Sequence, residues 1–332
     1  MTVDLRLFAP AAGRAFGERV AATIGAPLAP LEEREFEDGE HKARPLASVR
    51  GADVYVVQSL YGEPGRSVDD KLCRLLFIIA CLKDASAARV TAVVPYLCYT
   101  RKDRRTQPRD PVTTRYVAAL FEAAGVDRVV TLDVHNPAAF ENAFRCPTEH
   151  LEARGLFARH FAAVLAGKDV VVVSPDVGGA KRSELLRTSL AALLGRPVGN
   201  AFVEKHRAGG VVTGEAVVGD VAGKVALIVD DLISTGGTIA RAAASCRARG
   251  AEAVYAAATH GLFTGDAARV IADPALDQVI VTSSVPPFRL DAAALGGKLA
   301  VLDVAPLVGE AIRRLHAGGS LVELLEPPRP SS

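Results

Sequence analysis

Short apolar runs alternate with longer amphipathic stretches along most of the chain. The first half predicts strands at 52–60, 89–97 and 127–135, with helices between them at 68–85 and 113–125. The second half repeats the order, with strands expected within 168–179, 224–231 and 251–260 and helices at 180–195 and 239–250. Val-rich strands joined by helices of about ten or more residues are typical of parallel β-α-β units. The pattern therefore predicts an α/β protein with mainly parallel sheets flanked by helices.

The two halves can be laid over one another. The segment 89–105 takes the place of 224–238, and 127–135 takes that of 251–260, with a likeness in architecture more than in letters. A length of 332 residues suits about two domains. We expect an N-terminal domain at 1–148, a C-terminal domain at 149–304 and, within 305–332, a last helix that packs on the N-terminal domain.

Composition and charge limit the classes of function. Hydrophobic residues make up 49% of the chain, which supports a sizeable core and argues against disorder. A net charge of +1 argues against binding to nucleic acid or to an anionic membrane. No apolar run reaches the ~18 residues of a membrane span, and the N-terminus lacks a signal-peptide pattern, so we expect a cytoplasmic location. The cysteines form no CxxC pair and are expected to be reduced core thiols.

The stretch VDDLISTGGT, residues 229–238, carries the strongest chemical pattern. An apolar strand ends at Asp230 and Asp231, and a turn rich in glycine and hydroxyl residues then opens a helix. Glycines let backbone amides approach an anion, a helix N-terminus favours negative charge, and two acids suit ribose hydroxyls or a divalent ion. A bare turn of this kind is commonly an ordinary helix cap, but the doubled Asp favours a sugar-phosphate site. The pattern leaves open whether the protein consumes or makes a phosphoribosyl compound.

A longer charged loop occupies the matching position in the first half. The segment 100–111 reads TRKDRRTQPRDP, and its cations are Arg101, Lys102, Arg104, Arg105 and Arg109. Arginine forks match phosphate oxygens, and a mobile loop can close over a polyphosphate and exclude water. Such a run is often only a solvated loop, but the end of a parallel strand is where ligands bind. We therefore expect a phosphate-binding lid here.

Three further motifs are weaker when each is taken alone. FEDGE, 36–40, could hold a base and a ribose or be a plain turn. DVH and SPDVGG place His135 and Asp176 at strand ends, where imidazole and carboxylate can hold a divalent ion. In EKHR, Lys205 and Arg207 have the spacing of one strand face and could meet charge on a transferred phosphoryl group. The sequence has no P-loop, GxGxxG, HExxH or GxSxG motif.

Taken together and in this order, the motifs resemble those of the ribose-phosphate diphosphokinase (phosphoribosyl-diphosphate synthetase) family. The matching stretches extend over nearly the whole chain and include FEDGE, VVPYLCYTRKDRR, VDRVVTLDVH, VVVSPDVGGAKR, VEKHR and VALIVDDLISTGGT. The resemblance implies a tandem pair of phosphoribosyltransferase-like domains. It also implies a Mg²⁺-dependent transfer of the diphosphoryl group of ATP to O1 of ribose 5-phosphate, with release of AMP.

The resemblance also implies roles for individual residues. Those expected to bind ATP are Phe36, Asp38, Gly39, Glu40, Arg101, Lys102 and Asp103. The catalytic group is Lys205 and Arg207 with the lid residues Arg104, Arg105 and Arg109. The residues expected to bind ribose 5-phosphate are Asp230, Asp231, Ser234, Thr235, Gly236, Gly237 and Thr238. Those expected to bind Mg²⁺ are His135, Asp176 and Asp133. The family builds hexamers from dimers, which implies a homo-oligomer, and Ser48, Arg50 and Ser320 match its phosphate-binding regulatory regions.

The chain departs from the family pattern in several places. Lys102 replaces Gln, Arg74 replaces Glu, His206 stands where Glu is common and Ser234 where Asp is frequent, and the segment 136–147 also differs. None of these departures removes a charged group assigned to the metal or the transition state. They bear on regulation, on the subunit arrangement and on the phosphoryl donor.

Two alternative functions remain. A phosphoribosyltransferase would consume the product, but it would not require two domains, a basic lid and the other motifs. A catalytically weak homologue that regulates an active partner would be expected to have lost the lid cations or Lys205, and this chain retains them.

Overall fold

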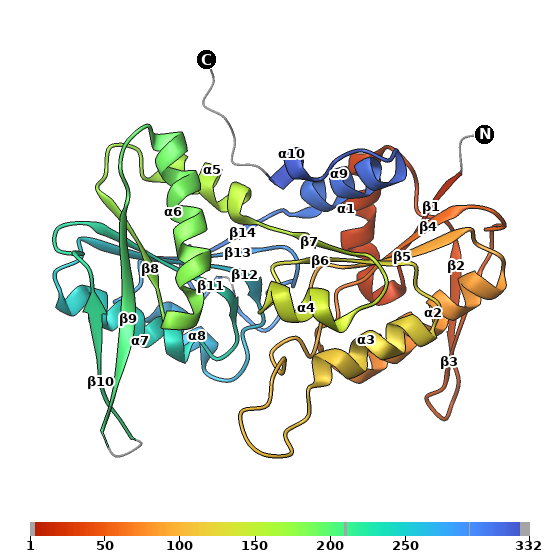
Figure 1. Ribbon diagram of the computed structural model, residues 1–332, viewed down its shortest axis with the longest axis horizontal. Helices are drawn as coiled ribbons and strands as arrows, with labels where there is room; N and C mark the ends of the chain where they lie inside the picture. Colours follow the sequence, from red (N-terminus) through yellow and green to blue (C-terminus); the bar gives the residue numbers. More distant parts are fainter. Residues whose placement is uncertain (1–3, 209–210, 292, 326–332) are drawn as a thin grey trace. The chain divides into compact units, whose positions relative to one another are not determined.

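A computed structural model describes residues 4–208, 211–291 and 293–325, with backbone alone at 205–208 and 211–215. Within these residues the chain divides into two compact units. Unit 1 comprises residues up to 152 together with 305–324, and unit 2 comprises residues 153–304. Each unit contains one main sheet covered by helices (Figure 1).

Unit 1 is built on a parallel sheet with the strand order β1-β4-β5-β6-β7. The strands are β1 (Leu5–Phe8), β4 (Asp53–Val57), β5 (Arg89–Val94), β6 (Arg128–Leu132) and β7 (Thr148–Leu151). Helices bury both faces of the central strands, which explains why these read as continuous apolar runs. The strands predicted at 52–60, 89–97 and 127–135 are confirmed, whereas β1 and β7 are too short to give a sequence pattern of their own.

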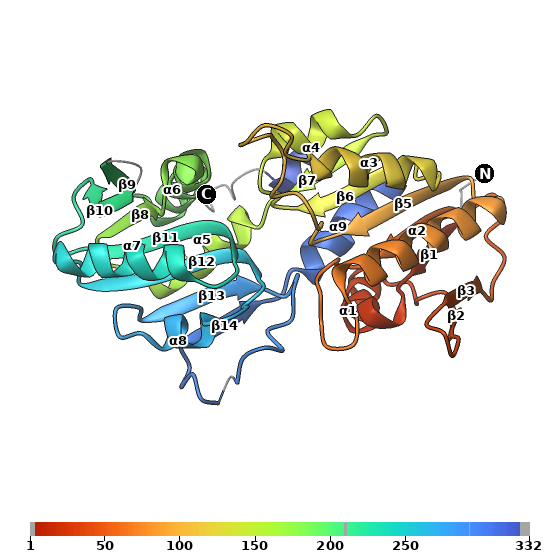
Figure 2. The same ribbon diagram turned by 90° about the horizontal axis from the view of Figure 1, so that it is seen from below.

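The helices of unit 1 cover both faces of this sheet (Figures 1 and 2). On one face lie α2 (Val68–Asp84), α3 (Thr113–Ala123) and α4 (Pro137–Ala143), and on the other lie α1 (Arg14–Ile24) and α9 (Ala305–His316). The helix α9 packs so closely on α1 that a Cβ on Gly309 would lie 2.7 Å from the Cβ of Thr23. At the end of α9, His316 Nδ1 lies 2.8 Å from Oδ2 of Asp53 in β4. The C-terminal helix is therefore an integral part of unit 1.

Unit 2 is built on a larger sheet with the order β10-β9-β8-β11-β12-β13-β14, in which only the β9–β10 pair is antiparallel among the described strands. The strands are β8 (Val170–Ser174), β9 (Gly199–Ala208), β10 (Val211–Val218), β11 (Val225–Ile233), β12 (Ala253–Gly261), β13 (Gln278–Thr282) and β14 (Leu299–Leu302). Helices α5 (Arg154–Val164) and α6 (Ala180–Leu194) cover one face (Figures 1 and 2). Helices α7 (Gly237–Ala248) and α8 (Ala267–Ala272) cover the other.

The two sheets repeat one arrangement. The run β4-β5-β6-β7 in unit 1 corresponds to β8-β11-β12-β13 in unit 2. As the overlay of the two halves predicted, β5 therefore matches β11 and β6 matches β12. The remaining short elements are the hairpin strands β2 (Leu31–Glu35) and β3 (His41–Pro45), the 3-10 turns η1 (Ala11–Gly13) and η2 (Val177–Gly179), and α10 (Val322–Leu325).

Two expectations from composition can be compared with the fold. None of the helices in the described residues is both long enough and apolar enough to cross a membrane. The cysteines are unpaired as expected, and Cys98 and Cys246 are buried. The expectation of a core thiol is wrong for Cys73, which is exposed because it lies on the outer face of α2.

Candidate active site

The two acids at the end of β11 lie beside one arginine of α6. Arg182 Nη1 is 3.4 Å from Asp230 Oδ1 and 3.5 Å from Asp231 Oδ1. Asp231 is only 3% exposed, and Asp230 Oδ1 accepts the backbone N–H of Asp231 at 2.9 Å. Burial and the adjacent Asp231 carboxylate raise the pKa of Asp230 above its usual range. The oxygens of the pair therefore suit a ligand that brings hydroxyl donors or positive charge.

The turn after these acids requires glycine. Gly236 has a φ of +79°, and a Cβ there would lie 2.9 Å from Cγ1 of Val270 in α8. Ser234 shares a hydrogen bond of 2.9 Å between its Oγ and the Oγ1 of Thr264, which holds the start of the turn. The Ser234 hydroxyl is thus already engaged within unit 2.

The helix α7 begins directly after this turn. It has no side-chain cap at Gly236, so the first backbone amides, including those of Gly237 and Thr238, lack a side-chain acceptor. A Cβ on Gly237 would come within 3.3 Å of Arg241 Nη1, so a side chain there would only require the arginine to shift slightly. Amides at a helix N-terminus next to a glycine turn form an anion site.

Asp176 follows β8 and shapes the neighbouring turn. Its Oδ1 accepts the N–H of Gly179 at 3.1 Å, while Ser174 Oγ donates to the Asp176 backbone carbonyl at 2.6 Å. A Cβ on Gly179 would lie 2.7 Å from Ser174 Oγ, so this turn requires glycine at position 179. One carboxylate oxygen of Asp176 thus holds the turn, and the other makes no hydrogen bond to the described residues.

The strand predicted for EKHR is present as part of β9. Lys205 pairs with Glu215 of β10, and Arg207 pairs with Val212. The side chains of Lys205 and Arg207 lie outside the described part of the chain, so their catalytic role stays a prediction.

In unit 1, the predicted lid, residues 100–111 between β5 and α3, is folded around Asp110. Its Oδ2 accepts from Lys102 Nζ at 2.5 Å, from Thr106 Oγ1 at 2.8 Å, and from the N–H groups of Thr106 and Gln107 at 3.0 Å each. These bonds, that of Lys102 above all, hold the pKa of Asp110 far below its usual range. Lys102, expected to bind ATP, is here bound within the lid.

The lid arginines, by contrast, are exposed. Arg101, Arg104 and Arg109 make no hydrogen bond or ion pair with any described residue, and Arg105 makes one, from Nε to the Asp110 carbonyl at 3.2 Å. The two acids of the lid bond to other groups: Asp110 to Lys102 and Thr106, and Asp103 to Asn136. The arginine guanidinium groups are therefore not neutralised by these carboxylates. The lid therefore presents a set of unpaired cations suited to a polyanion.

Asp133 and His135 lie in the turn that follows β6. Asp133 has a φ of +41°, which is uncommon for a residue other than glycine, and His135 is exposed. The next residue, Asn136, donates from Nδ2 to Oδ2 of Asp103 in the lid at 2.6 Å. The turn with Asp133 and His135 is thereby bonded to the lid.

The predicted metal residues do not form a closed cage. No group of three or more His, Cys, Asp or Glu side chains is placed to hold a metal ion in the part of the chain that the structure describes. Asp133 and His135 belong to unit 1, and Asp176 belongs to unit 2. A carboxylate such as that of Asp133 or Asp176 is the kind of ligand that Mg²⁺ takes, usually one or two per site with water and substrate phosphates, and the assignment of Mg²⁺ to these residues stays a prediction.

FEDGE forms the turn of the β2–β3 hairpin. Phe36 N donates to the Glu40 carbonyl at 2.8 Å, Gly39 has a φ of +90°, and Asp38 Oδ1 accepts the N–H of Glu40 at 3.1 Å. The guanidinium of Arg34 lies 4.7 Å from the centre of the Phe36 ring. The segment is therefore a plain turn in its backbone, and the Phe36 ring is in a cation–π contact with Arg34. Its contact with a base stays a prediction.

Sequence reasoning missed Arg182 and Asn136. Arg182 ends the motif VVVSPDVGGAKR, but its contact with the two acids could not be predicted, because these partners are more than forty positions away. Asn136 could have been found, since Asn followed by Pro137 is typical of a helix start. One departure from the family pattern has a local explanation: Arg74 of α2 donates to both carboxylate oxygens of Glu35 in the hairpin, at 3.3 and 3.1 Å.

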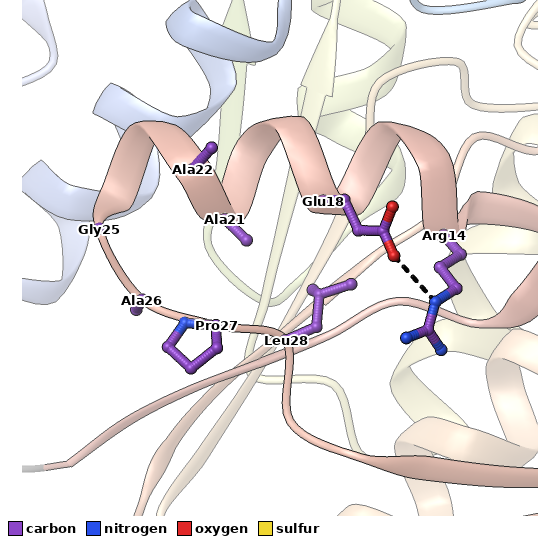
Figure 3. A pocket seen from close by; sticks show the side chains of 8 residues that line it. All are labelled: Arg14, Glu18, Ala21, Ala22, Gly25, Ala26, Pro27 and Leu28. Carbon is purple, nitrogen blue, oxygen red and sulfur yellow. Dashed lines mark hydrogen bonds and ion pairs between the residues drawn. The ribbon is translucent and has the colours of Figure 1, made fainter.

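A surface hollow beside α1 is separate from these groups (Figure 3). It encloses about 510 Å³ and is lined by Arg14, Glu18, Ala21, Ala22, Gly25, Ala26, Pro27 and Leu28. The two charged side chains, Arg14 and Glu18, bond to each other at 2.9 Å. No residue predicted for ATP, ribose 5-phosphate or metal lines it.

Comparisons with known proteins agree over nearly the whole chain. The model of the N-terminal domain of ribose phosphate pyrophosphokinase matches residues 5–125, and that of the phosphoribosyl synthetase-associated domain matches residues 211–326. A ribose-phosphate pyrophosphokinase of Caldanaerobacter subterraneus subsp. tengcongensis is 39% identical over 324 residues, which cover 97% of this chain and 98% of that protein. One from Listeria ivanovii is 38% identical over 323 residues, covering 97% of each.

Among solved structures, phosphoribosylpyrophosphate synthetase from Mycobacterium smegmatis matches with a TM-score of 0.85 and 36% identity. The match covers 95% of this chain and 100% of that one. The predicted fold, a tandem pair of phosphoribosyltransferase-like domains, is confirmed.

Proposed function

The chain belongs to the ribose-phosphate pyrophosphokinase family, and we propose that it transfers the diphosphoryl group of ATP to O1 of ribose 5-phosphate, giving 5-phosphoribosyl 1-diphosphate and AMP. One observation carries the proposal. The chain has a lid with unpaired arginines in unit 1 in addition to an acid–glycine turn in unit 2. A phosphoribosyltransferase would need only the second feature.

Ribose 5-phosphate binds in the C-terminal domain, 149–304. Asp230 and Asp231 accept hydrogen bonds from the ribose hydroxyls, because a buried acid pair with a single arginine favours such donors. The turn from Ser234 to Thr238 surrounds the 5-phosphate with backbone amides and the exposed hydroxyl of Thr235.

ATP binds in the N-terminal domain, 1–148. The adenine stacks on Phe36, with Asp38, Gly39 and Glu40 of the hairpin turn near the nucleoside. Arg101 and Asp103 lie at the start of the lid, and the exposed guanidinium groups of Arg104, Arg105 and Arg109 meet the phosphates. Lys102 contributes to this site by ordering the lid, through its bond to Asp110.

Charge stabilisation accounts for most of the catalysis. Phosphoryl transfer needs positioning, cations and a dry site rather than covalent work by the protein. Lys205 and Arg207 are the cations proposed to stabilise the charge that develops on the transferred group, while the lid excludes water. Asp176, Asp133 and His135 would hold Mg²⁺, which would neutralise charge on the substrate phosphates.

The assembly and location follow the same proposal. We expect a homo-oligomer built from dimers, as large as a hexamer, that works in the cytoplasm without nucleic acid or membrane. Size-exclusion chromatography with light scattering would test the assembly.

³¹P NMR of the purified protein with ribose 5-phosphate, ATP and Mg²⁺ tests the reaction. We expect AMP together with two coupled resonances of a diphosphate ester on the sugar C1. A sample without ribose 5-phosphate is the control and should keep its ATP.

Other spectra would overturn the proposal. ADP with a new phosphomonoester would indicate ordinary kinase chemistry. An unchanged spectrum, even after addition of inorganic phosphate and other nucleotide donors, would favour the regulatory homologue. Formation of ATP and ribose 5-phosphate from AMP and the diphosphate ester would be the expected reverse reaction.

A further inference from the structure

We propose that Asn136 is a positioning residue that fixes the arginine lid to the turn after β6. Its catalytic consequence rests on the proposed function, but the bond itself can be tested without any activity. The bond joins Asn136 Nδ2 to Asp103 Oδ2 at 2.6 Å, and both side chains are half-buried. A short bond between an amide donor and a carboxylate is charge-assisted and stronger than a neutral one.

The two ends of the Asn136 amide have different tasks. Its Oδ1 accepts the N–H of Ala139 at 3.2 Å and caps α4, where Pro137 takes the first helical position. This bond determines the orientation of the amide, because only an oxygen can accept from that N–H. The NH₂ group is therefore directed to Asp103 by the helix cap.

The lid has few other attachments of this kind. Thr114 Oγ1 donates to the carbonyls of Tyr99 and Lys102 at the base of the lid, at 3.0 and 3.2 Å. Thr100 Oγ1 donates to the Leu97 carbonyl, just before the lid, at 3.3 Å. Apart from the Asp103–Asn136 bond, the remaining side-chain bonds of residues 100–111 stay inside the lid, around Asp110. Within the described residues, the Asp103–Asn136 bond alone links a lid side chain to a segment beyond β5 and α3.

The position of Asn136 gives the bond its function. Asp110 determines the internal shape of the lid, whereas Asn136 determines where the lid lies relative to the turn with Asp133 and His135. The lid arginines are assigned to the phosphates of ATP, and Asp133 and His135 of this turn to the Mg²⁺ that accompanies those phosphates. Holding the lid and the turn in one geometry lowers the entropy lost when both engage the same nucleotide. Asn136 acts through Asp103 and need not touch the substrate.

Two substitutions separate the bond from the helix cap. Asn136→Ser keeps a good capping oxygen and removes the NH₂ donor. Asn136→Asp also keeps the cap but places a second carboxylate against Asp103, so attraction becomes repulsion. Asn142→Asp is the matched control, because it adds the same charge on α4, where Asn142 Nδ2 bonds only to the Ala138 carbonyl.

The rate of limited trypsin digestion measures how firmly the lid is held, since trypsin cleaves after the exposed Arg101, Arg104 and Arg105. We expect roughly tenfold faster cleavage in the lid for Asn136→Asp and a smaller increase for Asn136→Ser, the size that loss of a bond to a charged group produces. Asn142→Asp should be cleaved at the wild-type rate. The exchanged pair Asp103→Asn with Asn136→Asp restores one amide, one carboxylate and the cap, and should return cleavage close to the wild-type rate.

Kinetics give the second readout. With Asn136→Ser, kcat should fall roughly tenfold while the KM for ribose 5-phosphate stays within about twofold, because that sugar is assigned to unit 2. Wild-type cleavage of Asn136→Asp, or no restoration by the exchanged pair, would overturn the proposal. If wild type itself formed no diphosphate ester, the proposed function would fail while the digestion would still decide the role of Asn136.

Discussion

The turns after β5 and β11 occupy the same place in their two sheets but differ in the groups that they offer to an anion. After β11, the residues Ser234–Gly236 lead straight into α7, and the anion site consists of backbone amides beside the half-buried Asp230 and the buried Asp231. After β5, residues 95–112 separate the strand from α3, and the charged groups are exposed arginine side chains. One turn suits a small phosphate monoester, whereas the other suits a polyphosphate that must be enclosed.

The two turns are also held in their conformations by different interactions. The short turn needs glycine where a Cβ would strike Val270, and its acids are held by Arg182 in a buried setting. The lid needs no glycine, because Asp110 collects hydrogen bonds from Lys102, Thr106 and Gln107 and leaves the arginines outside. Changes in the short turn should therefore alter stability and its pH dependence, and changes in the lid arginines should alter turnover.

The largest effect is expected in the lid. Arg104→Ala should lower kcat at least about a hundredfold, as loss of a cation aimed at developing charge typically does. Its thermal midpoint should not change, because Arg104 contacts no described residue through a hydrogen bond or ion pair. Steady-state kinetics and calorimetry measure the two quantities. Arg115→Ala, an equal charge change on exposed surface of α3, is the control; a similar loss there would mean that overall charge matters rather than the lid.

A smaller effect, on stability, is expected in the short turn. Gly236→Ala combines a φ of +79° with a Cβ 2.9 Å from Val270 Cγ1 and should lower the free energy of unfolding by about 1–3 kcal/mol. Gly223→Ala is matched, with a φ of +66° and no atom near its Cβ, and should lose only about 1 kcal/mol. Urea unfolding would measure both. Equal losses would show that the close approach to α8 is unimportant.

A third effect concerns the pH dependence of stability. The raised pKa of Asp230 means that the folded protein keeps a proton that the unfolded chain releases above about pH 4. Stability should therefore fall as the pH rises above about 4, with a slope of at most about 1.4 kcal/mol per pH unit from this group. Asp230→Asn should remove that fall and leave the protein more stable than wild type at pH 8. Unfolding curves at pH 6 and 8 would measure it, and parallel behaviour of both proteins would contradict a protonated Asp230.

Much of the fold and the chemistry of the site could be predicted without a structure. Strands such as β5 and β11 are buried by helices on both faces, so they consist of continuous apolar runs that can be recognised in the sequence. The acids and glycines of 229–238 are likewise recognisable from their order, since a glycine turn at a helix start has few other uses next to two acids. The strands β1 and β7 escaped prediction because so short a run has no periodicity.

The partners of individual side chains depended on tertiary structure. Arg182 approaches Asp230 across 48 positions, and Asn136 reaches Asp103 across 33, because packing brings separate helices and turns together. Lys102 has the charge of a phosphate ligand, yet in the folded lid its ammonium group donates to the Asp110 carboxylate. Residue types and local periodicity thus predicted by themselves the central strands, the main helices and the kind of ligand that we propose. Which charges are buried, paired or left free was decided only by the fold, because those properties arise from contacts between segments that are distant in the chain.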